Sequence, residues 1–473
     1  MKLKKINRIN NKALSAFHSI IDPSMIGDIV RATNVQAEHK NDSFRMNCVD
    51  LLAFIGCLYS RGLFSSGIAV RELWSRYYGH PIFKRLSTKN KFETIMKFLR
   101  FDDRRTREIR KSDSFYKLGE VWNNFIGNSS KCYYPGKFIT IDELLSSKTR
   151  CPCTQFIPSK PDKYGIKFWL ACSQDTKYVI NGLPYLGCID QEKMLQGGDG
   201  QGESVVKRLM APFLRKNHTL TTDNHFTSYK LGSFLLSEKT GFLGTMKNNK
   251  REIPQSALDK KNPVNTAEFY DNQKGLLLTI YQAKKNKKVV MLSSQHEKAE
   301  FISHKTRTDK LKLSSIHSYN YSKCGVDTVD QMTKQYSVKY PTRRWPIAVW
   351  YNILNLAGIN SWILYKEVNN SNISRREFLI KLVEEIVESL DSDTSYINKT
   401  IKIVEKDLCY WRNKLPSTSQ STSITSINSN DSFLSSMSPT LNKKRKSFGC
   451  QTKLCNNNRS INSCSQCSRS CCG

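Results

Sequence analysis

The chain has 473 residues, of which 74 are Lys or Arg and 41 are Asp or Glu, so its formal net charge is +33. A charge this one-sided is unusual for a cytosolic enzyme and indicates a polyanionic partner, for which nucleic acid is the first candidate. The sequence has no uninterrupted apolar run of about 18 residues and no apolar segment behind its basic first residues. We therefore expect neither a membrane-spanning helix nor a secretory signal.

Residues 1–131 have the spacing of helices. Asp22 followed by Pro23 is typical of a helix start, and we expect a helix from here to about Ala32. Two more helices are predicted over residues 49–59 and 90–99, where apolar residues recur every three or four positions. A basic stretch follows, made of Arg100, Arg104, Arg105, Arg107, Arg110 and Lys111. It could face phosphates or form a solvated surface, and the local sequence favours neither.

A strand pattern begins at residue 137. Residues 137–145 are dense in apolar and β-branched side chains and predict a buried strand, in which Asp142 is out of place. Asp142 is either a polar residue at an exposed strand end or part of a metal or catalytic site, and on this strand alone the first is commoner. The elements predicted next are a hairpin of 164–172 with 177–183, helix 203–214, strand 218–222, helix 227–236 and strand 241–246.

Three strands in a meander, followed by helix, strand, helix and strand, are the order of the ribonuclease-H-like fold. In that order the first and fourth strands are neighbours, so Asp142 and Asp223, which follows the fourth strand, are expected to lie close together. Residues 249–312 interrupt the unit with a Lys-rich strand pair and are interpreted as an insertion. Asp327 and Asp330 are three apart and would share one helix face, although such pairs are commonly surface acids.

Two helices, over 345–365 and 375–390, precede a polar and cysteine-rich C-terminal part. Residues 416–440 are dominated by Ser, Thr and Asn and are expected to form a disordered linker. The basic run at 443–446 resembles a nuclear-import signal, although four residues are a weak signal. Six of the 15 cysteines lie in the last 24 residues, and a reducing compartment favours metal over disulfides there. Zinc ligands are expected among Cys450, Cys455, Cys464, Cys467 and Cys471.

Several blocks of this sequence resemble the piggyBac-type transposases, a family of DDE transposases. The blocks occur in the family's order between about residues 80 and 370. They are FLRFDD (98–103), IDE (141–143), IPSKPDKYGIK (157–167), GLPYLG (182–187), TDNHFTS (222–228), GVDTVDQM (325–332), RRWP (343–346) and GIN (358–360).

The resemblance implies an α/β, ribonuclease-H-like catalytic core with an insertion, flanked by an all-α dimerisation and DNA-binding domain and a small Cys-rich zinc module. It implies cleavage and transfer of DNA strands at TTAA sites, with two Mg²⁺ ions per active site held by Asp142, Asp223, Asp327 and Asp330. Carboxylates are ligands that Mg²⁺ prefers. The expected partners are double-stranded DNA at the element ends and a second copy of the chain, with no membrane, and the expected location is the nucleus.

DNA contacts and domain limits are expected as well. The expected DNA contacts are Arg100, Arg104, Arg105, Arg343, Arg344 and Trp345. The tail is expected to hold about one zinc ion per chain, the number for a single four-thiolate site. The predicted domains are a helical domain (1–136 and 337–414), the catalytic core (137–248 and 313–336), the insertion (249–312), the linker with its basic run (415–446) and the zinc-binding tail (447–473).

Departures from the family pattern keep alternatives open. Leu144 directly follows Glu143 where the family usually has a Gln, and Ser147-Lys148-Thr149-Arg150 replaces a further family block. A DNA-cutting transposase is the first hypothesis. A domesticated or decayed relative that binds DNA without cutting it is the second. A protein–protein adaptor with a zinc tail is the third, which the charge of +33 disfavours.

Overall fold

A computed structural model describes most of the chain. The described residues are 11–110, 113–146, 151, 153–158, 160, 163–187, 200–296, 301–303, 311–391, 462–463 and 470–471; of 301–303, 311–312 and the last two pairs only the backbone is described. The chain divides into two units, Met1–Asn413 and Lys414–Gly473. In the second, strands β12 (Asn462–Ser463) and β13 (Ser470–Cys471) pair antiparallel.

Most of the expected tail features lie outside the described residues. These are the Ser-rich linker, the basic run at 443–446 and the expected zinc ligands Cys450, Cys455, Cys464 and Cys467. Cys471 is described only as backbone within β13. The zinc module therefore stays a prediction.

Helices make up the described N-terminal part of the first unit. They are α1 (Ala13–His18), α2 (Pro23–His39), α3 (Cys48–Phe64), α4 (Ile82–Leu86), α5 (Lys89–Phe98) and α6 (Gly119–Cys132), with short 3-10 turns η2 (Val70–Glu72) and η3 (Arg104–Thr106). The predicted cap of α2 is confirmed, because Asp22 Oδ1 accepts the N–H of Met25 at 2.9 Å. The helix continues beyond Ala32 to His39, since Gln36 and Ala37 are still buried by packing.

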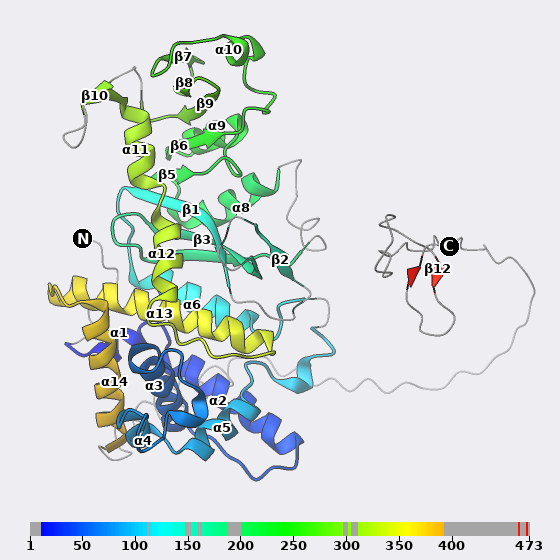
Figure 1. Ribbon diagram of the computed structural model, residues 1–473, viewed down its shortest axis with the longest axis vertical. Coiled ribbons are helices and arrows are strands. Elements are labelled where there is room, and N and C mark those ends of the chain that lie inside the picture. Colours follow the sequence, from blue (N-terminus) through cyan, green and yellow to red (C-terminus); the bar gives the residue numbers. More distant parts are fainter. Residues whose placement is uncertain are drawn as a thin grey trace, which may run out of the picture. The chain divides into compact units, whose positions relative to one another are not determined.

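Two helices from the C-terminal half of the unit return to this layer (Figure 1). The long α13 (Trp345–Asn369) lies against α1 and α6, and α14 (Arg375–Asp391) lies against α3 and α1. Among the described helices, only α13 is long and apolar enough to cross a membrane by length and composition. However, 89% of its apolar window is buried inside the protein, as in a core helix. Packing thus joins segments more than 200 residues apart in one helical layer.

A nine-stranded mixed sheet forms the other layer. Its order is β2-β3-β1-β5-β6-β9-β8-β7, with β4 also paired to β3. The strands are β1 (Phe138–Leu145), β2 (Thr154–Phe156), β3 (Tyr164–Ser173), β4 (Val179–Pro184), β5 (Thr219–Thr222), β6 (Gly241–Met246), β7 (Ala267–Asp271), β8 (Leu277–Lys284) and β9 (Lys287–Ser293). The antiparallel hairpin of β3 and β4 and the parallel pairing of β1 with β5 confirm two predictions. The protein is therefore a mixed α/β fold, as predicted.

The strands of the expected insertion continue this sheet. Strand β9 pairs antiparallel with β6, so β7, β8 and β9 extend the central layer at one edge. The sequence pattern predicted β8 and β9 as a pair but not their attachment to β6, which joins residues about 50 apart in the chain by backbone pairing. The short strands β2 and β7 and helix α10 (Gln255–Asp259) were also missed. The domain limits stay predictions.

The remaining helices lie between or after the strands. They are α8 (Gln201–Met210), the 3-10 turn η4 (Ala211–Phe213), α9 (Tyr229–Ser237), α11 (Ser314–Ser322) and α12 (Gly325–Lys334), and a small strand pair, β10 (Phe301–Ser303) with β11 (Leu311–Leu313), precedes α11. The helix predicted over 203–214 ends at Met210, because Pro212 has no N–H to continue the α-helical ladder.

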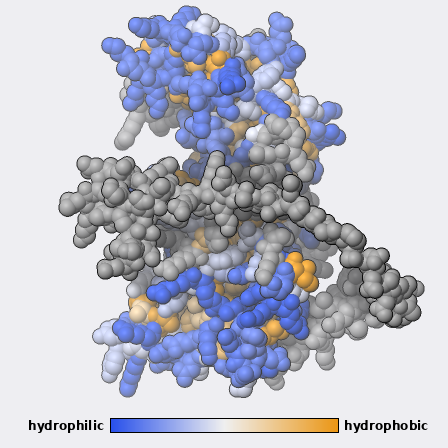
Figure 2. Space-filling view, turned by 90° about the vertical axis from the view of Figure 1, so that its right-hand side faces the viewer, coloured by the Kyte–Doolittle hydropathy of each residue, from blue (hydrophilic) through white to orange (hydrophobic). Residues whose placement is uncertain are grey.

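One hydrophobic core runs from the helical layer into the sheet. It includes Trp122 of α6, Trp169 of β3 and Trp350 of α13, each at most 1% exposed. The face shown in Figure 2 is mostly hydrophilic where it is described, with apolar residues in small scattered groups. The apolar side chains are thus largely used to hold the two layers together.

Candidate active site

The pairing of β1 with β5 places two aspartates side by side. In this parallel ladder Ile141 is the partner of Thr222, so the next residues along each strand are Asp142 and Asp223. Neighbouring strands lie about 4.8 Å apart. Loops at the carboxyl ends of parallel strands are where open α/β sheets commonly bind ligands. The register therefore brings together the first two acids that the sequence singled out.

Helix α12 brings the other two acids to the same region, and its first residue explains how. Gly325 lies so close to β1 that a Cβ atom there would be 2.6 Å from Thr140 Oγ1. The same Thr140 Oγ1 donates to the carbonyl of Ser322 at 2.6 Å, which fixes the end of α11 on β1. Glycine is thus required at position 325 by a close approach of helix to strand. Asp327 and Asp330 follow within the first turns of α12.

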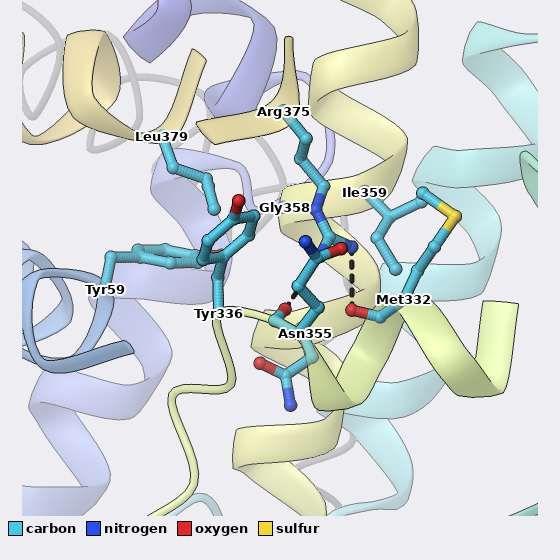
Figure 3. Close-up of a pocket in the computed structure, with 9 residues that line it drawn as sticks. Tyr59, Met332, Tyr336, Asn355, Gly358, Ile359, Arg375 and Leu379 are labelled. Atoms are coloured by element: carbon cyan, nitrogen blue, oxygen red, sulfur yellow. Dashed lines mark hydrogen bonds between the residues drawn. The ribbon is translucent and has the colours of Figure 1, made fainter. Parts of the chain in front are cut away.

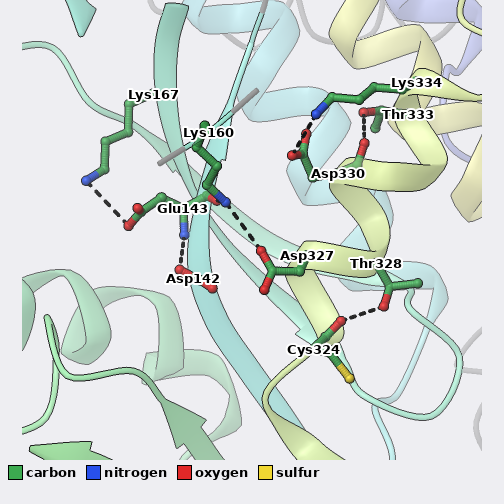
Figure 4. A network of polar contacts seen from close by, with 10 residues as sticks. All are labelled: Asp142, Glu143, Lys160, Lys167, Cys324, Asp327, Thr328, Asp330, Thr333 and Lys334. Carbon is green, nitrogen blue, oxygen red and sulfur yellow. Dashed lines mark hydrogen bonds and ion pairs between the residues drawn. The ribbon is translucent and has the colours of Figure 1, made fainter. Parts of the chain in front are cut away.

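Three of the acids at this site are paired with lysines (Figure 4). The pairs are Lys160 Nζ with Asp327 Oδ1 at 3.3 Å, Lys334 Nζ with Asp330 Oδ2 at 3.2 Å, and Lys167 Nζ with Glu143 Oε2 at 3.7 Å.

Asp142 and Asp223 have no ion pair of their own among the described residues. Asp142 Oδ1 accepts the N–H of Glu143 at 2.7 Å, and Asp223 Oδ1 accepts the N–H of His225 at 2.9 Å. The two carboxylates that lie on neighbouring strands are therefore the ones that lack a lysine.

The surroundings of these two carboxylates disfavour their charged forms. Burial, and then the negative charges of Asp223 and Glu143, raise the pKa of Asp142 from 3.8 to about 7. Burial also raises the pKa of Asp223, with the charge of Glu143 adding to it and the N–H of His225 opposing it. Carboxylates held together in this way form a region that an added positive charge would stabilise.

The donor atoms fit a hard divalent cation, although the described side chains are not gathered around one. Within the described residues, no group of three or more His, Cys, Asp or Glu side chains lies at metal-binding spacing. Asp142 and Asp223 supply carboxylate oxygens from adjacent strands, and neither is in an ion pair within the described part of the chain. Carboxylate oxygens are ligands that Mg²⁺ prefers. Asp327 is 62% exposed at its side chain and is held by Lys160, while Asp330 is buried and held by Lys334.

The predicted DNA-contacting residues fall into two groups. Arg104, Arg105 and Arg343 are exposed, and Arg105 pairs with Asp103 at 2.7 Å. Arg344 instead turns inward and donates to the carbonyls of Met96 (2.8 Å), Lys97 (3.3 Å) and Leu99 at the end of α5.

Two more of these residues also make contacts within the protein. Trp345 stacks on Phe115 with ring centroids 5.7 Å apart, and the half-buried Arg100 donates to the carbonyl of Leu99 at 2.8 Å. Trp345, Arg100 and Arg344 therefore have packing roles that the sequence did not reveal. DNA contact by all six residues stays a prediction.

Arg375 ties the end of α12 to the helical layer. Its guanidinium lines a small pocket and donates to the carbonyls of Met332 and Gln335, each at 2.7 Å (Figure 3). It also lies over the Tyr336 ring, 5.1 Å from the centroid. Because these carbonyls end α12, Arg375 caps the helix that carries Asp327 and Asp330. The sequence offered only a basic residue opening an amphipathic helix, so this role was not predicted.

The lysines around the acids were likewise not assigned a role from sequence. Lys160 and Lys167 belong to the block at 157–167, which is rich in lysine. In sequence, these two side chains cannot be distinguished from ordinary solvent-exposed lysines. Their partners, Asp327 and Glu143, are 167 and 24 residues away. The pair of Lys160 with Asp327 forms only because α12 packs on β1, which the sequence does not show.

The structure thus places two acids at the carboxyl end of the parallel pairing of β1 with β5 and two more on a following helix. A family model described as Transposase IS4 matches residues 12–362, so the chain belongs to this family of transposases. The relatives below show that it is of the piggyBac type.

A solved structure supports this at the level of the whole fold. The chain is similar to one described as "Cryo-EM structure of piggyBac transposase synaptic complex with hairpin DNA", with a TM-score of 0.76 and 28% identity over 100% of this chain and 97% of that one.

Two curated human relatives are also similar. PiggyBac transposable element-derived protein 2 is 24% identical over 372 residues, which cover 74% of this chain and 61% of that protein. PiggyBac transposable element-derived protein 3 is 22% identical over 385 residues, covering 78% and 64%. The chain thus spans less than two thirds of the length of these relatives.

Proposed function

We propose that the protein is a DNA transposase that cleaves and transfers DNA strands by a DDE mechanism, with TTAA as its target sequence. The observation that carries the proposal is the register of β1 with β5, which sets Asp142 beside Asp223, with neither carboxylate in an ion pair among the described residues. The family and the similarity to a piggyBac transposase bound to DNA supply the substrate class.

In this proposal Asp142, Asp223 and Asp327 would hold Mg²⁺, and Asp330 would act as a fourth acid. When bound, Mg²⁺ would activate a water or a 3′-hydroxyl for attack and would stabilise the leaving oxygen. The protein's own contribution is to hold the carboxylates on rigid elements. Asp142 is held in a strand paired on both sides, and Asp327 on a helix fixed by Gly325 at its start and Arg375 at its end.

The surface charge and the sequence similarity support the remaining parts of the proposal. A net charge of +33 would favour a DNA partner, and exposed Arg104 and Arg343 are candidates for phosphate contacts. A homodimer, a nuclear location and a zinc-binding tail are proposed from the family resemblance.

The test is a nicking and strand-transfer assay on a DNA end carrying its inverted repeat, in Mg²⁺, with wild type, Asp142→Asn and Asp327→Asn. We expect wild type to yield nicked and joined products, and each variant to lose at least about a hundredfold, because even changes beyond the metal ligands commonly cost about 10- to 100-fold. Asp259→Asn, an exposed acid on α10, is the matched control and should keep full activity.

A second function is DNA binding without cleavage. Two observations favour it. The sequence departs from the family pattern at Leu144 and 147–150, and two of the four proposed catalytic acids, Asp327 and Asp330, are paired with lysines. Wild type that binds the DNA end but gives no more product than Asp142→Asn would establish this second function and refute the first.

A further inference from the structure

Lys160 places an ammonium group inside the carboxylate cluster. Its Nζ lies 3.3 Å from Asp327 Oδ1 on α12 and donates to the carbonyl oxygen of Glu143 on β1 at 3.1 Å. The side chain is only 14% exposed, whereas that of Asp327 is 62% exposed. Figure 4 shows Lys160 reaching from its loop into the space between the strand and the helix. It therefore connects the two elements that carry the proposed catalytic acids.

The other two lysines of the cluster do not make such a connection. Lys334 pairs with Asp330 within the same helix, four residues apart, and 43% of its side chain is exposed. Lys167 pairs with Glu143 across the adjacent strands β1 and β3, and its ammonium also lies over the rings of Trp169 and Tyr185. Only Lys160, of the three, spans from β1 to α12.

The charges around Lys160 explain why an ammonium is stable there. Burial alone would lower the pKa of Lys160, but the charges of Asp142, Asp327, Asp330 and Glu143 outweigh it, so its pKa is raised. A lysine that gives up hydration and side-chain freedom needs compensation of this kind. In return it offsets the repulsion among acids that have been brought to one place by the fold.

We propose that Lys160 is a positioning residue that acts as a built-in counter-cation, holding Asp327 toward β1 while the site is free of metal and releasing it when a divalent cation binds. A divalent cation at Asp142 and Asp223 would repel the ammonium and compete with it for the same Asp327 oxygen. The inference rests on the proposed function in one respect, since it needs the same carboxylates to bind a cation.

Thermal unfolding with and without Ca²⁺ tests the proposal without DNA or cleavage. Ca²⁺ is the probe because it takes carboxylate oxygens. In EDTA we expect Lys160→Met to melt about 2–4 °C below wild type, because the acids lose their counter-charge. Saturating Ca²⁺ should remove most of that difference. The Ca²⁺ concentration for the half-maximal shift should be about three- to tenfold lower in Lys160→Met than in wild type. Lys160→Arg, which keeps the charge, should behave like wild type.

The control variant is Lys91→Met, which breaks a pair with Asp50 (2.5 Å) in the helical layer and should lower the melting temperature equally in EDTA and in Ca²⁺. If Lys160→Met shows the same Ca²⁺-independent loss, Lys160 has only a packing role and the inference is overturned, while the metal site stands. If Ca²⁺ shifts neither wild type nor Lys160→Met, the metal site of the proposed function fails as well.

A second measurement uses the wild-type protein, so it does not depend on a variant that folds. Lysine acetylation by an N-hydroxysuccinimide ester is followed residue by residue with mass spectrometry, in EDTA and in Ca²⁺. We expect Ca²⁺ to speed acetylation of Lys160 at least about threefold, because its amine is released from Asp327, with Lys91 unchanged. Equal rates for Lys160 in the two conditions would overturn the release step.

Discussion

Asp142 shows how one side chain can oppose folding and yet serve the site. It lies in a strand paired on both sides, beside the carboxylate of Asp223, and its nearest hydrogen bond comes from the N–H of Glu143. Its pKa of about 7 means that the folded protein without metal binds the Asp142 proton more tightly than the unfolded chain does. A carboxylate whose pKa is raised strongly by burial and by neighbouring acids is typical of a functional site.

The stability of the metal-free protein should therefore depend on pH through Asp142. Because the pKa is raised from 3.8 to about 7 on folding, the stabilising effect of protonation is fully present below about pH 4 and is lost as pH rises through 7. The slope from this group is at most about 1.4 kcal/mol per pH unit. We expect Asp142→Asn in EDTA to be more stable than wild type at about pH 8 and equal to it at about pH 4, measured by urea unfolding. Asp259→Asn serves as the control, and an Asp142→Asn curve parallel to wild type from pH 4 to 8 would contradict the expectation.

At the scale of elements, α12 is held against the sheet by contacts at its two ends. Its first residue touches Thr140 of β1, and its last carbonyls accept from Arg375 of α14. The position of Asp327 and Asp330 thus depends on the sheet and on the helical layer at once. Changes far from the acids in sequence should then be felt at the site.

Gly325→Ala tests the contact between α12 and β1. The added Cβ would lie 2.6 Å from Thr140 Oγ1 and 2.8 Å from Thr140 Cβ, so the helix start must move away from the strand. We expect a loss of about 1–3 kcal/mol in the free energy of unfolding, as for other overpacked sites, together with reduced DNA cleavage.

Gly127→Ala is the matched control for this substitution. Gly127 also lies in a helix, α6, but a Cβ there would have no atom within 4 Å. Alanine should stabilise this position by about 0.5–1 kcal/mol, since glycine is the poorer helix former. Equal effects of the two substitutions would show that the approach to Thr140 is not what determines residue 325.

The adjacent residues Arg343 and Arg344 allow a second test, of the contacts that hold the end of α5. Arg344 donates to three carbonyls at the end of α5, and burial, together with the charge of Arg100, lowers its pKa to about 10. Arg344→Ala leaves these carbonyls without their donor and should cost about 2–3 kcal/mol in urea unfolding. Arg343→Ala, at the exposed neighbour, should stay within about 0.5 kcal/mol of wild type. A larger loss for Arg343→Ala would contradict the inward orientation of Arg344.

At the scale of the whole molecule, charge dominates the expected behaviour with DNA. A net charge of +33 predicts binding that depends steeply on salt. If six to ten phosphates are contacted, raising the salt from about 50 to about 200 mM should weaken binding by about 10³- to 10⁵-fold, measured by fluorescence anisotropy. Arg343→Ala should weaken binding to all sequences and reduce the slope of log affinity against log salt by about one. Binding that is insensitive to salt would argue against a DNA partner.

The elements that local patterns specify were predictable from the sequence. The Asp22-Pro23 start of α2, the β3–β4 hairpin and the two acids on α12 each depend on neighbours a few residues away. The adjacency of Asp142 and Asp223 was also predictable, because the strand order makes β1 and β5 neighbours and each acid lies at the carboxyl end of its strand pairing.

Tertiary structure decided what depends on partners distant in the chain. Lys160 meets Asp327 across 167 residues, Arg344 meets Met96 across 248, and β9 joins β6 through backbone groups that carry no sequence signature. The sequence does not tell whether a charged side chain faces water, a carboxylate or the end of a helix. Only the packing of the folded chain distinguishes these environments. The sequence by itself therefore determined which acids this protein brings together, and the fold determined which lysine stands among them and which arginines hold their supporting helices.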